Sequence, residues 1–283
     1  MVLNSAARGE LAAFLLSRRR QLAPEAVGLE ITGQRRTPGL RREEVSLLSG
    51  VSLTWYTWLE QGRDISPSRQ VMNALARTLL LSPAEHAYVL RLTHHGHEAP
   101  LASAPVPFPA HVQRLLDALG DSPAFATTPH WSIVGWNRAY SAFYPHVGTT
   151  PEAERNLLWL VFTDPYVREL LVDWPTDSRR FLTQFRAEAG SRIHEPAFAG
   201  LVERLSQVSE HFRLGWASHD IEQFASSQRR FEHPRAGTLL LEHHRLDVSD
   251  HPDLHVVVYT AAENSDTAAR LAELMGGRLP PGC

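Results

Sequence analysis

Residues 41–62 read RREEVSLLSGVSLTWYTWLEQG and have the layout of two short helices joined by a tight turn. Gly50 supplies the turn between the two helices, and Val51 follows it as an apolar residue suited to the core. Ser52 can cap the second helix because its hydroxyl group can accept a hydrogen bond from a backbone N–H group. This stretch therefore predicts a helix-turn-helix.

The spacing of apolar residues gives each of these two helices an inner and an outer face. Val45 and Leu48 share one face of the first helix, and Tyr56 and Leu59 are expected to point inward from the second. The outer face of the second helix is then formed by Leu53, Thr54, Trp55, Thr57 and Trp58. In such a motif the second helix lies in the DNA major groove, with its N-terminal residues over base edges. We therefore expect a DNA-binding regulator.

Length and composition limit the class of protein. The chain has 283 residues, enough to bury one or two complete cores, so two domains are expected. The net charge is -3, but arginines outnumber acidic residues in the first third, where phosphate groups would bind. No apolar run approaches the roughly 20 residues that cross a bilayer, and no secretion signal is visible, so we expect a cytoplasmic protein without membrane contact.

A Pro-rich segment divides the chain. Residues 96–109, GHEAPLASAPVPFP, have no apolar periodicity, as expected of a semi-rigid linker. We expect residues 1–95 to form an all-α, five-helix domain whose first helix spans about Gly9 to Gln21 and whose last begins after Ser82. Residues 110–283 are expected to form the second domain.

The second domain mixes strand and helix patterns. Strands are predicted at 124–127, 131–136, 229–233, 237–246 and 254–260. Helices are predicted at 111–119, from Asn137 onward, at 153–162, 165–173, 176–189 and 196–215, and from about Asp266 onward. Two strands, a helical middle and three closing strands favour an α+β domain with an antiparallel sheet.

Most of the chain resembles one family. Residues 35–63, RRTPGLRREEVSLLSGVSLTWYTWLEQGR, are similar to the helix-turn-helix of the MmyB-like bacterial transcription regulators, which is of the Cro and phage-repressor type. The resemblance continues in SPAFATTPHWSIVGWNRAYSAFYP (122–145), ERNLLWLVFTDPYVRELLVDW (154–174) and LEHHRLDVSDHPDLHVVVYT (241–260). It implies a PAS-like second domain that senses a small apolar or amphipathic molecule, for example a fatty-acid-like one, and controls operator affinity.

The resemblance also implies how DNA would be held. Arg41 and Arg42 should meet phosphate at the start of the first motif helix, with Arg35, Arg36 and Arg63 as further phosphate contacts. The alternative for any single arginine is a solvated surface charge. Glu60 should pair with an arginine of the first helix, here Arg19, in a structural role. An insertion containing Arg35 and Arg36 departs from the usual repressor pattern.

Base reading is assigned to Leu53, Thr54, Trp55 and Thr57. None of these side chains makes the bidentate contacts of Arg, Gln or Asn, so we expect hydroxyl hydrogen bonds and packing against thymine methyl groups. The alternative for Trp55 and Trp58 is packing against a partner domain or subunit. Because one such domain contacts a single half-site, a homodimer on a near-palindromic operator in double-stranded DNA is expected.

Aromatic residues concentrate in the second domain, and a few polar residues accompany them. For most of the aromatics an ordinary core position is the more common role. A small-molecule site combines apolar walls with a few convergent polar groups. The candidate ligand-binding residues are Trp136, Asn137, Tyr140, Trp159, Phe162, Phe181, Phe185, Arg186, Phe212, Trp216, His219, His243 and Tyr259.

Signatures of catalysis and metal binding are missing from the sequence. There is no G-x-S-x-G, GxxxxGK, GxGxxG or HExxH motif, and the single cysteine is Cys283, so we expect no catalytic residues, no metal site and no obligatory cofactor. Asp164, Asp173 and Asp177 are interpreted as helix caps or solvated residues. The alternatives to a ligand-controlled regulator are a ligand-independent DNA-binding or protein-interaction scaffold and an enzyme with an appended DNA-binding domain.

Overall fold

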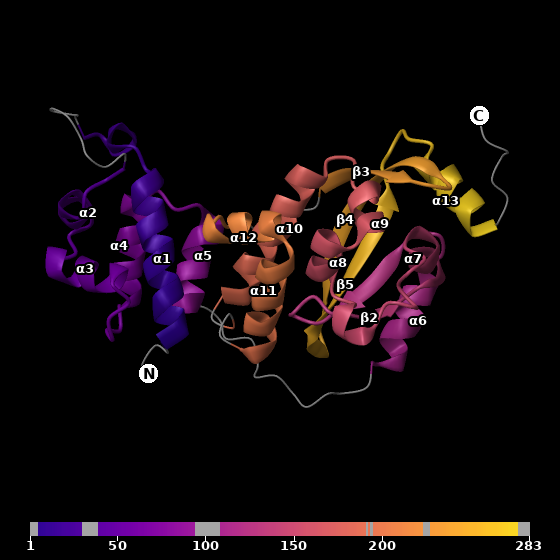
Figure 1. The fold of residues 1–283 in the computed structure, drawn as a ribbon, viewed down its shortest axis with the longest axis horizontal. Coiled ribbons are helices and arrows are strands. Elements are labelled where there is room, and N and C mark those ends of the chain that lie inside the picture. The colour runs from indigo at the N-terminus through magenta and orange to yellow at the C-terminus, as the bar shows by residue number, and fades with distance from the viewer. Residues whose placement is uncertain are drawn as a thin grey trace. The chain divides into compact units, whose positions relative to one another are not determined.

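A computed structural model of the chain describes residues 5–29, 39–93, 108–190, 192, 195–222 and 227–276. The chain forms two compact units (Figure 1). The first comprises residues 1–98, 186–202 and 213–223, and the second comprises 99–185, 203–212 and 224–283. Residues 186–202 and 213–223, which the sequence analysis places in the second domain, thus belong to the first unit.

The first unit contains the predicted helix-turn-helix domain. Its helices are α1 (Ser5–Gln21), η1 (Pro24–Val27), α2 (Arg42–Ser49), α3 (Leu53–Glu60), α4 (Arg69–Thr78) and α5 (Pro83–Leu92). The hydroxyl groups of Ser52, Ser68 and Ser82 cap α3, α4 and α5 by accepting backbone hydrogen bonds. Buried residues of α1 to α5 form one core, which Ala187 and Ile221 join from later in the chain. The predicted five-helix, all-α class is confirmed.

The inner face of α2 differs from the prediction. Val45 is fully buried, as expected, but Leu48 is 40% exposed, so its assignment to the inner face was wrong. The helix has only eight residues and ends at Gly50, whose φ of 72° turns the chain away directly after Ser49. Val51 fills the core at this point instead.

The described residues of the second unit form a five-stranded antiparallel sheet in the order β2-β1-β5-β4-β3. The strands are β1 (Ala124–Thr127), β2 (Ile133–Trp136), β3 (Ser227–His233), β4 (Gly237–Val248) and β5 (His251–Ala261). Each predicted strand is present, with shifts of a few residues at the ends. The α+β class with an antiparallel sheet is confirmed.

The two faces of the sheet carry different side chains. Ala124 and Val256 belong to a core shared with Val112 and Leu116 of α6 (Ala110–Ala118). On the opposite face, Tyr259 packs against Phe143 of α7 (Arg138–Phe143), with ring centroids 5.8 Å apart. The alternation of side chains along each strand therefore gives the sheet one aliphatic and one aromatic face.

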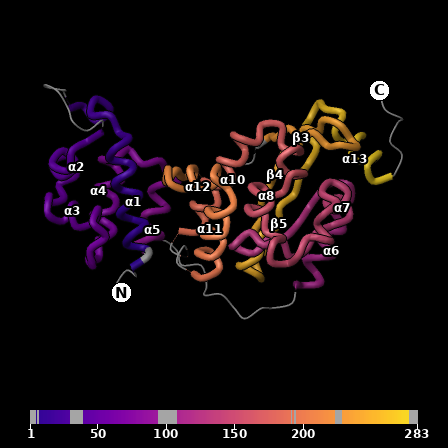
Figure 2. Tube along the Cα trace, viewed as in Figure 1, coloured from indigo at the N-terminus to yellow at the C-terminus, as the bar shows by residue number. Residues whose placement is uncertain are grey.

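The helical middle of the chain is more divided than its apolar pattern predicts. It comprises η2 (Glu152–Glu154), α8 (Leu157–Thr163), α9 (Pro165–Leu170), α10 (Trp174–Ala189), α11 (Pro196–Val208) and α12 (Glu210–Ala217), and α13 (Thr267–Gly276) follows the sheet. The single helix predicted over 196–215 breaks at Ser209, whose hydroxyl accepts a hydrogen bond from the Phe212 N–H group and so starts α12. Helix α10 is continuous (Figure 2), with residues up to Phe185 in the second unit and the remainder in the first.

A search of the described helices found none that is both long and apolar enough to cross a membrane.

Two glycines of the first unit should respond oppositely to substitution by alanine. A Cβ atom at Gly39 would lie 2.3 Å from the carbonyl oxygens of Arg19 and Arg20, so Gly39→Ala should destabilise the unit by about 1–3 kcal/mol. A Cβ atom at Gly9, within α1, would meet nothing within 4 Å, so Gly9→Ala should stabilise it by about 0.5–1 kcal/mol. Thermal unfolding followed by circular dichroism measures both. Changes of the same sign would contradict the close approach at Gly39.

Candidate DNA-reading surface and ligand cavity

The orientation of α3 is determined at its N-terminus by the turn before it. The Ser46 hydroxyl donates a hydrogen bond to the Val51 carbonyl at 2.7 Å, and the Trp55 N–H group donates to the Ser52 hydroxyl at 3.3 Å. Tyr56 and Leu59 are buried, as predicted. These hydrogen bonds fix the start of α3, and the helix face opposite Tyr56 and Leu59 remains accessible to solvent.

The predicted base-reading residues differ in exposure. Leu53 and Thr54 are exposed in the first turn of α3, whereas Trp55 and Thr57 are half-buried. Trp55 also packs against the helical core, which favours a partly structural role for its ring. Trp58 is half-buried, and the guanidinium of Arg63 lies over its ring, 5.7 Å from the centroid. Leu53 and Thr54 are therefore the most accessible of the four predicted base contacts.

The end of α3 is held by a buried carboxylate. Arg19 donates hydrogen bonds from Nε to Glu60 Oε1 at 2.5 Å and from Nη2 to Glu60 Oε2 at 3.0 Å. The third bond of this guanidinium runs from Nη1 to the Leu40 carbonyl oxygen at 2.7 Å. The pairing of Glu60 with Arg19 is thus confirmed. Burial alone would raise the pKa of Glu60, but hydrogen bonds from Arg19 and Arg42 outweigh it and lower that pKa.

The predicted phosphate contacts are not equivalent. Arg42 donates a hydrogen bond from Nε to Glu60 Oε2 at 2.7 Å, although its side chain remains 40% exposed. Arg41 is exposed, and its backbone N–H group donates to Glu44 Oε2 at 2.7 Å. Arg63 is also exposed, while Arg35 and Arg36 lie outside the described residues. Arg42 therefore combines a structural contact with a partly accessible cation.

The second unit contains a small apolar cavity between the aromatic face of the sheet and the helices. Its volume is about 30 Å³, and three of the predicted ligand-binding residues, Tyr140, Phe181 and Tyr259, line it. The other lining residues are Phe143, Tyr144, Leu157, Leu160, Val161, Val167, Leu170, Leu171 and Phe231. Typical ligand pockets are roughly 300–1,000 Å³, so the lining must move before a larger molecule enters.

Five predicted aromatic ligand contacts pack elsewhere in the second unit. Phe162 and Phe212 meet edge to face at 5.2 Å, and Phe185 meets Trp131 at 5.3 Å. Trp159 and Trp136 are half-buried beneath the guanidinium groups of Arg204 and Arg155, at 4.9 and 5.0 Å from the ring centroids. Phe185 and Phe212 are buried, which matches the core position that was the alternative for most aromatics.

Asn137 has a structural role in the second unit. Its Oδ1 accepts hydrogen bonds from the Ala124 and Tyr140 N–H groups, and its Nδ2 donates to the Leu116 and Ser122 carbonyl oxygens. The side chain therefore caps α7 and joins it to β1 and α6, with all of its usual hydrogen bonds made. His243 is also buried, with its ring 6.4 Å from that of Tyr259.

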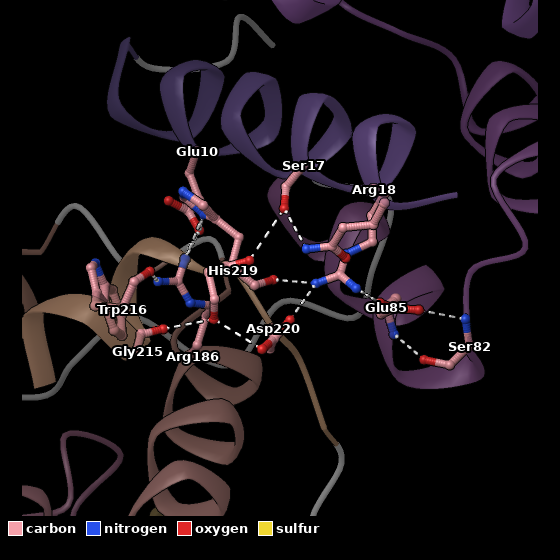
Figure 3. Close-up of polar contacts among 12 residues, drawn as sticks. Glu10, Ser17, Arg18, Ser82, Glu85, Arg186, Gly215, Trp216, His219 and Asp220 are labelled. Atoms are coloured by element: carbon pink, nitrogen blue, oxygen red, sulfur yellow. Dashed lines mark hydrogen bonds and ion pairs between the residues drawn. The ribbon is translucent and has the colours of Figure 1, made fainter. Parts of the chain in front are cut away.

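Three other predicted ligand contacts, Arg186, Trp216 and His219, belong to the first unit (Figure 3). Arg186 is fully buried and donates hydrogen bonds from Nη1 to Glu10 Oε1 at 2.6 Å and to His219 Nδ1 at 2.8 Å. Its Nη2 donates to the Trp216 carbonyl oxygen, and its guanidinium lies 3.8 Å from the centroid of the Trp216 ring. The structure therefore brings these residues together with α1 and not with the cavity.

Glu10 of α1 is the counter-ion in this cluster. Its Oε1 accepts a further hydrogen bond from the Tyr88 hydroxyl at 2.6 Å. Burial would raise the pKa of Glu10, but His219, Arg186 and Tyr88 outweigh it and lower that pKa to about 2. A neighbouring set of contacts links Arg18 Nη2 to the His219 carbonyl oxygen at 2.9 Å and to Asp220 Oδ1 at 3.1 Å (Figure 3).

A buried ion pair near the cavity was missed at the sequence level. Arg229 of β3 lies with Nε 3.3 Å from Asp177 Oδ1 of α10, and both side chains are buried. The interpretation of Asp177 as a cap or solvated residue was therefore wrong, whereas Asp164 does cap α9 through the Tyr166 N–H group. The available signal was strand alternation, which puts Arg229 on the same face of β3 as the buried Phe231.

Comparison with protein families agrees with both units. Residues 10–89 match a helix-turn-helix domain, and residues 108–274 match the MmyB-like transcription regulator ligand binding domain. The second match covers more than half of the chain. The chain belongs to the MmyB-like transcription regulators. This MmyB-like regulator thus joins a DNA-binding domain to a ligand-binding domain, and the predicted family is confirmed.

Comparison with curated protein sequences gave no match for this MmyB-like regulator.

One group of side chains in the ligand-binding domain has metal-ligand chemistry. The possible ligand atoms of His111, Asp250 and His251 lie within 4.8 Å of one another, at the protein surface. The His111 and His251 rings are stacked at 5.4 Å, and His111 Nε2 is 3.2 Å from Asp250 Oδ2. Such surface groups also occur without an ion, so this arrangement gives the regulator no assigned metal site.

Removing the charge of Glu60 should destabilise the DNA-reading unit strongly. Glu60→Gln leaves the buried Arg19 without a counter-ion, so we expect a loss of about 3–5 kcal/mol, measured by hydrogen exchange of the α1 and α3 amides. As a control, Asp64→Asn breaks the pair with Arg8, in which the Asp64 side chain is 64% exposed, and should cost at most about 1 kcal/mol.

The effect of Glu60→Gln should also depend on pH. The pKa of Glu60 is lowered in the folded state, so its contribution is present above the unfolded pKa of about 4.3 and is lost as the pH falls through the folded pKa. The stability difference between wild type and Glu60→Gln should therefore shrink on acidification below that unfolded pKa. A difference that does not change with acid, or equal losses in the Glu60 and Asp64 variants, would contradict the buried charge pair.

Proposed function

We propose that this MmyB-like regulator binds a small apolar or amphipathic molecule, of fatty-acid-like character, in its α+β domain. In this proposal the bound molecule changes the affinity of the helix-turn-helix for its operator. The observation that carries the proposal is the apolar cavity lined by Tyr140, Phe181, Phe231 and Tyr259. The antiparallel strand order β2-β1-β5-β4-β3, with helices packed on the aromatic face, supports a PAS-like description of this domain.

The size of the cavity determines how a ligand would enter. A volume of about 30 Å³ holds little more than a water molecule, so a longer molecule has to spread the side chains around it. Each buried methylene group contributes about 0.8 kcal/mol, which can offset the cost of moving several aromatic rings. Binding therefore favours a flexible linear molecule that fills the cavity progressively, and its affinity should rise with chain length.

For the DNA-reading surface we propose that α3 enters the major groove with Leu53, Thr54, Trp55 and Thr57 over base edges. Arg41, Arg42 and Arg63 contact phosphate in this arrangement, as do Arg35 and Arg36 of the segment outside the described residues. A homodimer on a near-palindromic operator in the cytoplasm supplies two such helices. The exposure of Leu53, Thr54, Arg41 and Arg63 supports this assignment.

We propose that the protein acts by binding alone, with no catalytic residue and no obligatory cofactor. The cavity lining supports this, because it is almost wholly hydrocarbon and offers no acid, base or nucleophile to a bound molecule apart from tyrosine hydroxyl groups. Burial raises the pKa of Tyr140, Tyr144 and Tyr259, which keeps those hydroxyl groups protonated. A ligand-independent scaffold is one alternative, and it predicts DNA binding that no small molecule changes. An enzyme with an appended DNA-binding domain is the other, and it predicts turnover of a bound molecule.

Helix α10 provides a physical route for the proposed control. Phe181 lines the cavity in the second unit, and Arg186, five residues later in the same helix, is held by Glu10 in the first unit. Because a hydrogen-bonded helix moves as one body, a ligand that shifts the backbone of α10 at Phe181 would also shift Arg186. If one arrangement of the protein binds the ligand more tightly than another, and the two arrangements also differ in affinity for DNA, then the ligand changes the DNA affinity by linkage.

The direct test is native mass spectrometry of protein purified from cells, followed by operator selection with and without the molecule that it carries. We expect a retained small molecule and a change in operator affinity of about 5-fold or more on its removal. A protein without a retained molecule whose DNA affinity is unchanged by a series of linear aliphatic compounds would favour the scaffold alternative.

Weakening the hold on Arg186 should reduce the coupling without changing the cavity. In Glu10→Gln the carboxylate charge is lost, so decanoic acid should still bind while its effect on operator affinity decreases, measured by fluorescence anisotropy of labelled operator. Asp266→Asn is the control, because the pair of Asp266 with Arg270 is exposed. Arg270 lies in α13, and Asp266 directly precedes that helix. Equal coupling in wild type and Glu10→Gln would exclude this route.

Substitutions on the DNA-reading surface should separate phosphate contacts from base contacts. Arg41→Ala should weaken binding to all sequences alike and reduce the slope of log K against log salt by about 1. Thr54→Ala should instead change which operator sequence is preferred, with a cost of about 1–3 kcal/mol at the contacted position. Salt titrations and operator selection with both variants measure these effects. A change in sequence preference from Arg41→Ala, or a uniform loss from Thr54→Ala, would contradict the assigned roles.

A further inference from the structure

Three side chains that can bind metal ions come together at the turn between β4 and β5. His111 is the second residue of α6, Asp250 lies in the turn itself, and His251 is the first residue of β5. None of the three lines the cavity. The sequence predicts no metal site because these residues share no motif, and only the fold brings the start of α6 to this turn. Proximity alone does not assign an ion, but three further features favour one.

The first feature is the spacing of the possible ligand atoms. His111 Nε2 lies 3.2 Å from Asp250 Oδ2, and His251 Nε2 lies 3.9 Å from the same oxygen. Nitrogen and oxygen ligands bind zinc at roughly 2.0–2.2 Å, which separates two tetrahedral ligands by about 3.3–3.6 Å. The two observed distances lie on either side of that range, whereas the hydrogen bond between His255 and Asp247 on the same hairpin is 2.8 Å long. One ion among the three groups would therefore need only small movements of their side chains.

The second feature is the support behind the ligands. The rings of His111 and His251 are stacked, with their centroids 5.4 Å apart. Val112, the neighbour of His111, is buried in a core with Val256 of β5. Val248, which pairs with His251 across the turn, packs against the same core. Because α6 and the β4–β5 hairpin are anchored in one core, the ligands are held near one another before an ion binds.

The third feature is the charge and accessibility of the turn. Residues 245–255, RLDVSDHPDLH, contain three aspartates but only one basic residue that is always charged, Arg245. Such an excess of negative charge attracts cations. The side chains of His111 and Asp250 are 48% and 67% exposed, so water can reach an ion and complete its coordination. The turn therefore offers a cation both nitrogen ligands and a favourable local field.

We propose that His111, Asp250 and His251 bind a divalent transition-metal ion, for which zinc is the best match. Two imidazole nitrogens and one carboxylate oxygen suit zinc, whereas magnesium and calcium prefer sets of oxygen ligands. Water takes the fourth position. The ion ties the start of α6 to the β4–β5 turn and so stabilises the second unit. This site is separate from the cavity, and the inference does not depend on the proposed function.

The test is equilibrium dialysis of the full chain, prepared without an affinity tag, against zinc chloride, with bound zinc counted by mass spectrometry. Every protein carries Cys283→Ser, because a thiolate is itself a strong zinc ligand. His111→Gln and His251→Gln should each bind one ion fewer per chain, or bind it more weakly by about 10-fold or more. Asp250→Asn should also weaken binding. Zinc should raise the melting temperature of the parent protein more than that of these three variants.

His146→Gln is the matched control. His146 is exposed and its Nδ1 lies 3.9 Å from Asp164 Oδ2, but the described residues place no third ligand group beside this pair. The control should bind as much zinc as the parent protein. His94, His95 and His97 lie outside the described residues and are the same in every variant, so any ion that they bind cancels in the comparison.

Three results would overturn the site. The first is zinc binding that is unchanged in both His111→Gln and His251→Gln, and the second is a parent protein that binds no zinc. The third is displacement of the ion by a modest excess of magnesium chloride, because that would indicate an acidic surface without nitrogen ligands. All three results leave open whether a small molecule enters the cavity, so they are distinguishable from a failure of the proposed function.

Discussion

Burial of guanidinium groups is the constraint on which both units depend. A guanidinium cannot shed its proton at ordinary pH, so each buried arginine has to find carboxylates and carbonyl oxygens inside the protein. Arg19 finds Glu60 and so fixes α3 against α1. Arg186 finds Glu10 and so fixes the end of α10 against α1. Arg229 finds Asp177 and so joins β3 to α10 beside the cavity.

The pairing of Glu60 also explains why the short helix α3 keeps a fixed orientation. Helix α3 has eight residues and would not hold its direction alone. Its N-terminus is held by Ser52 and its C-terminal residue, Glu60, is held by Arg19 and Arg42. Because Arg42 contributes to this hold and is also partly exposed, a phosphate group bound by Arg42 would also affect the orientation of α3.

The sequence predicts well those features that depend on residues close together in the chain. The Gly50 turn, the Ser52 cap and strand β1 follow from local geometry, because a positive φ, a capping hydroxyl and an apolar run act within a few residues. The core residues Tyr56 and Leu59 also follow, because helical periodicity alone separates the two faces of α3. For the same reason the strand and helix order of the second unit could be predicted with small shifts at the ends.

What the sequence does not predict depends on partners that are distant along the chain. Nothing near Arg186 indicates that Glu10, 176 positions earlier, accepts its hydrogen bond, so it was expected at the ligand site. Asp177 and Arg229 are likewise brought together only by the packing of α10 on β3. The predictions for Leu48 and for the helix through Ser209 were wrong for a local reason. The apolar spacing continues through these residues, although a glycine turn or a serine cap ends the helix there.

Helix α10 is where these long-range contacts meet. Asp177 and Phe181 are four residues apart and lie on one face of the helix, so the same face of α10 contacts Arg229 and lines the cavity. Arg186 lies further along and on another face, where Glu10, His219 and Trp216 surround it. The cavity is too small for an aliphatic chain, so the proposed ligand would bind only arrangements in which Phe181 has moved. In the proposed mechanism, the difference in ligand affinity between those arrangements is the free energy available to disturb Arg186, and the hydrogen bonds of Arg186 would determine how much of it reaches α1.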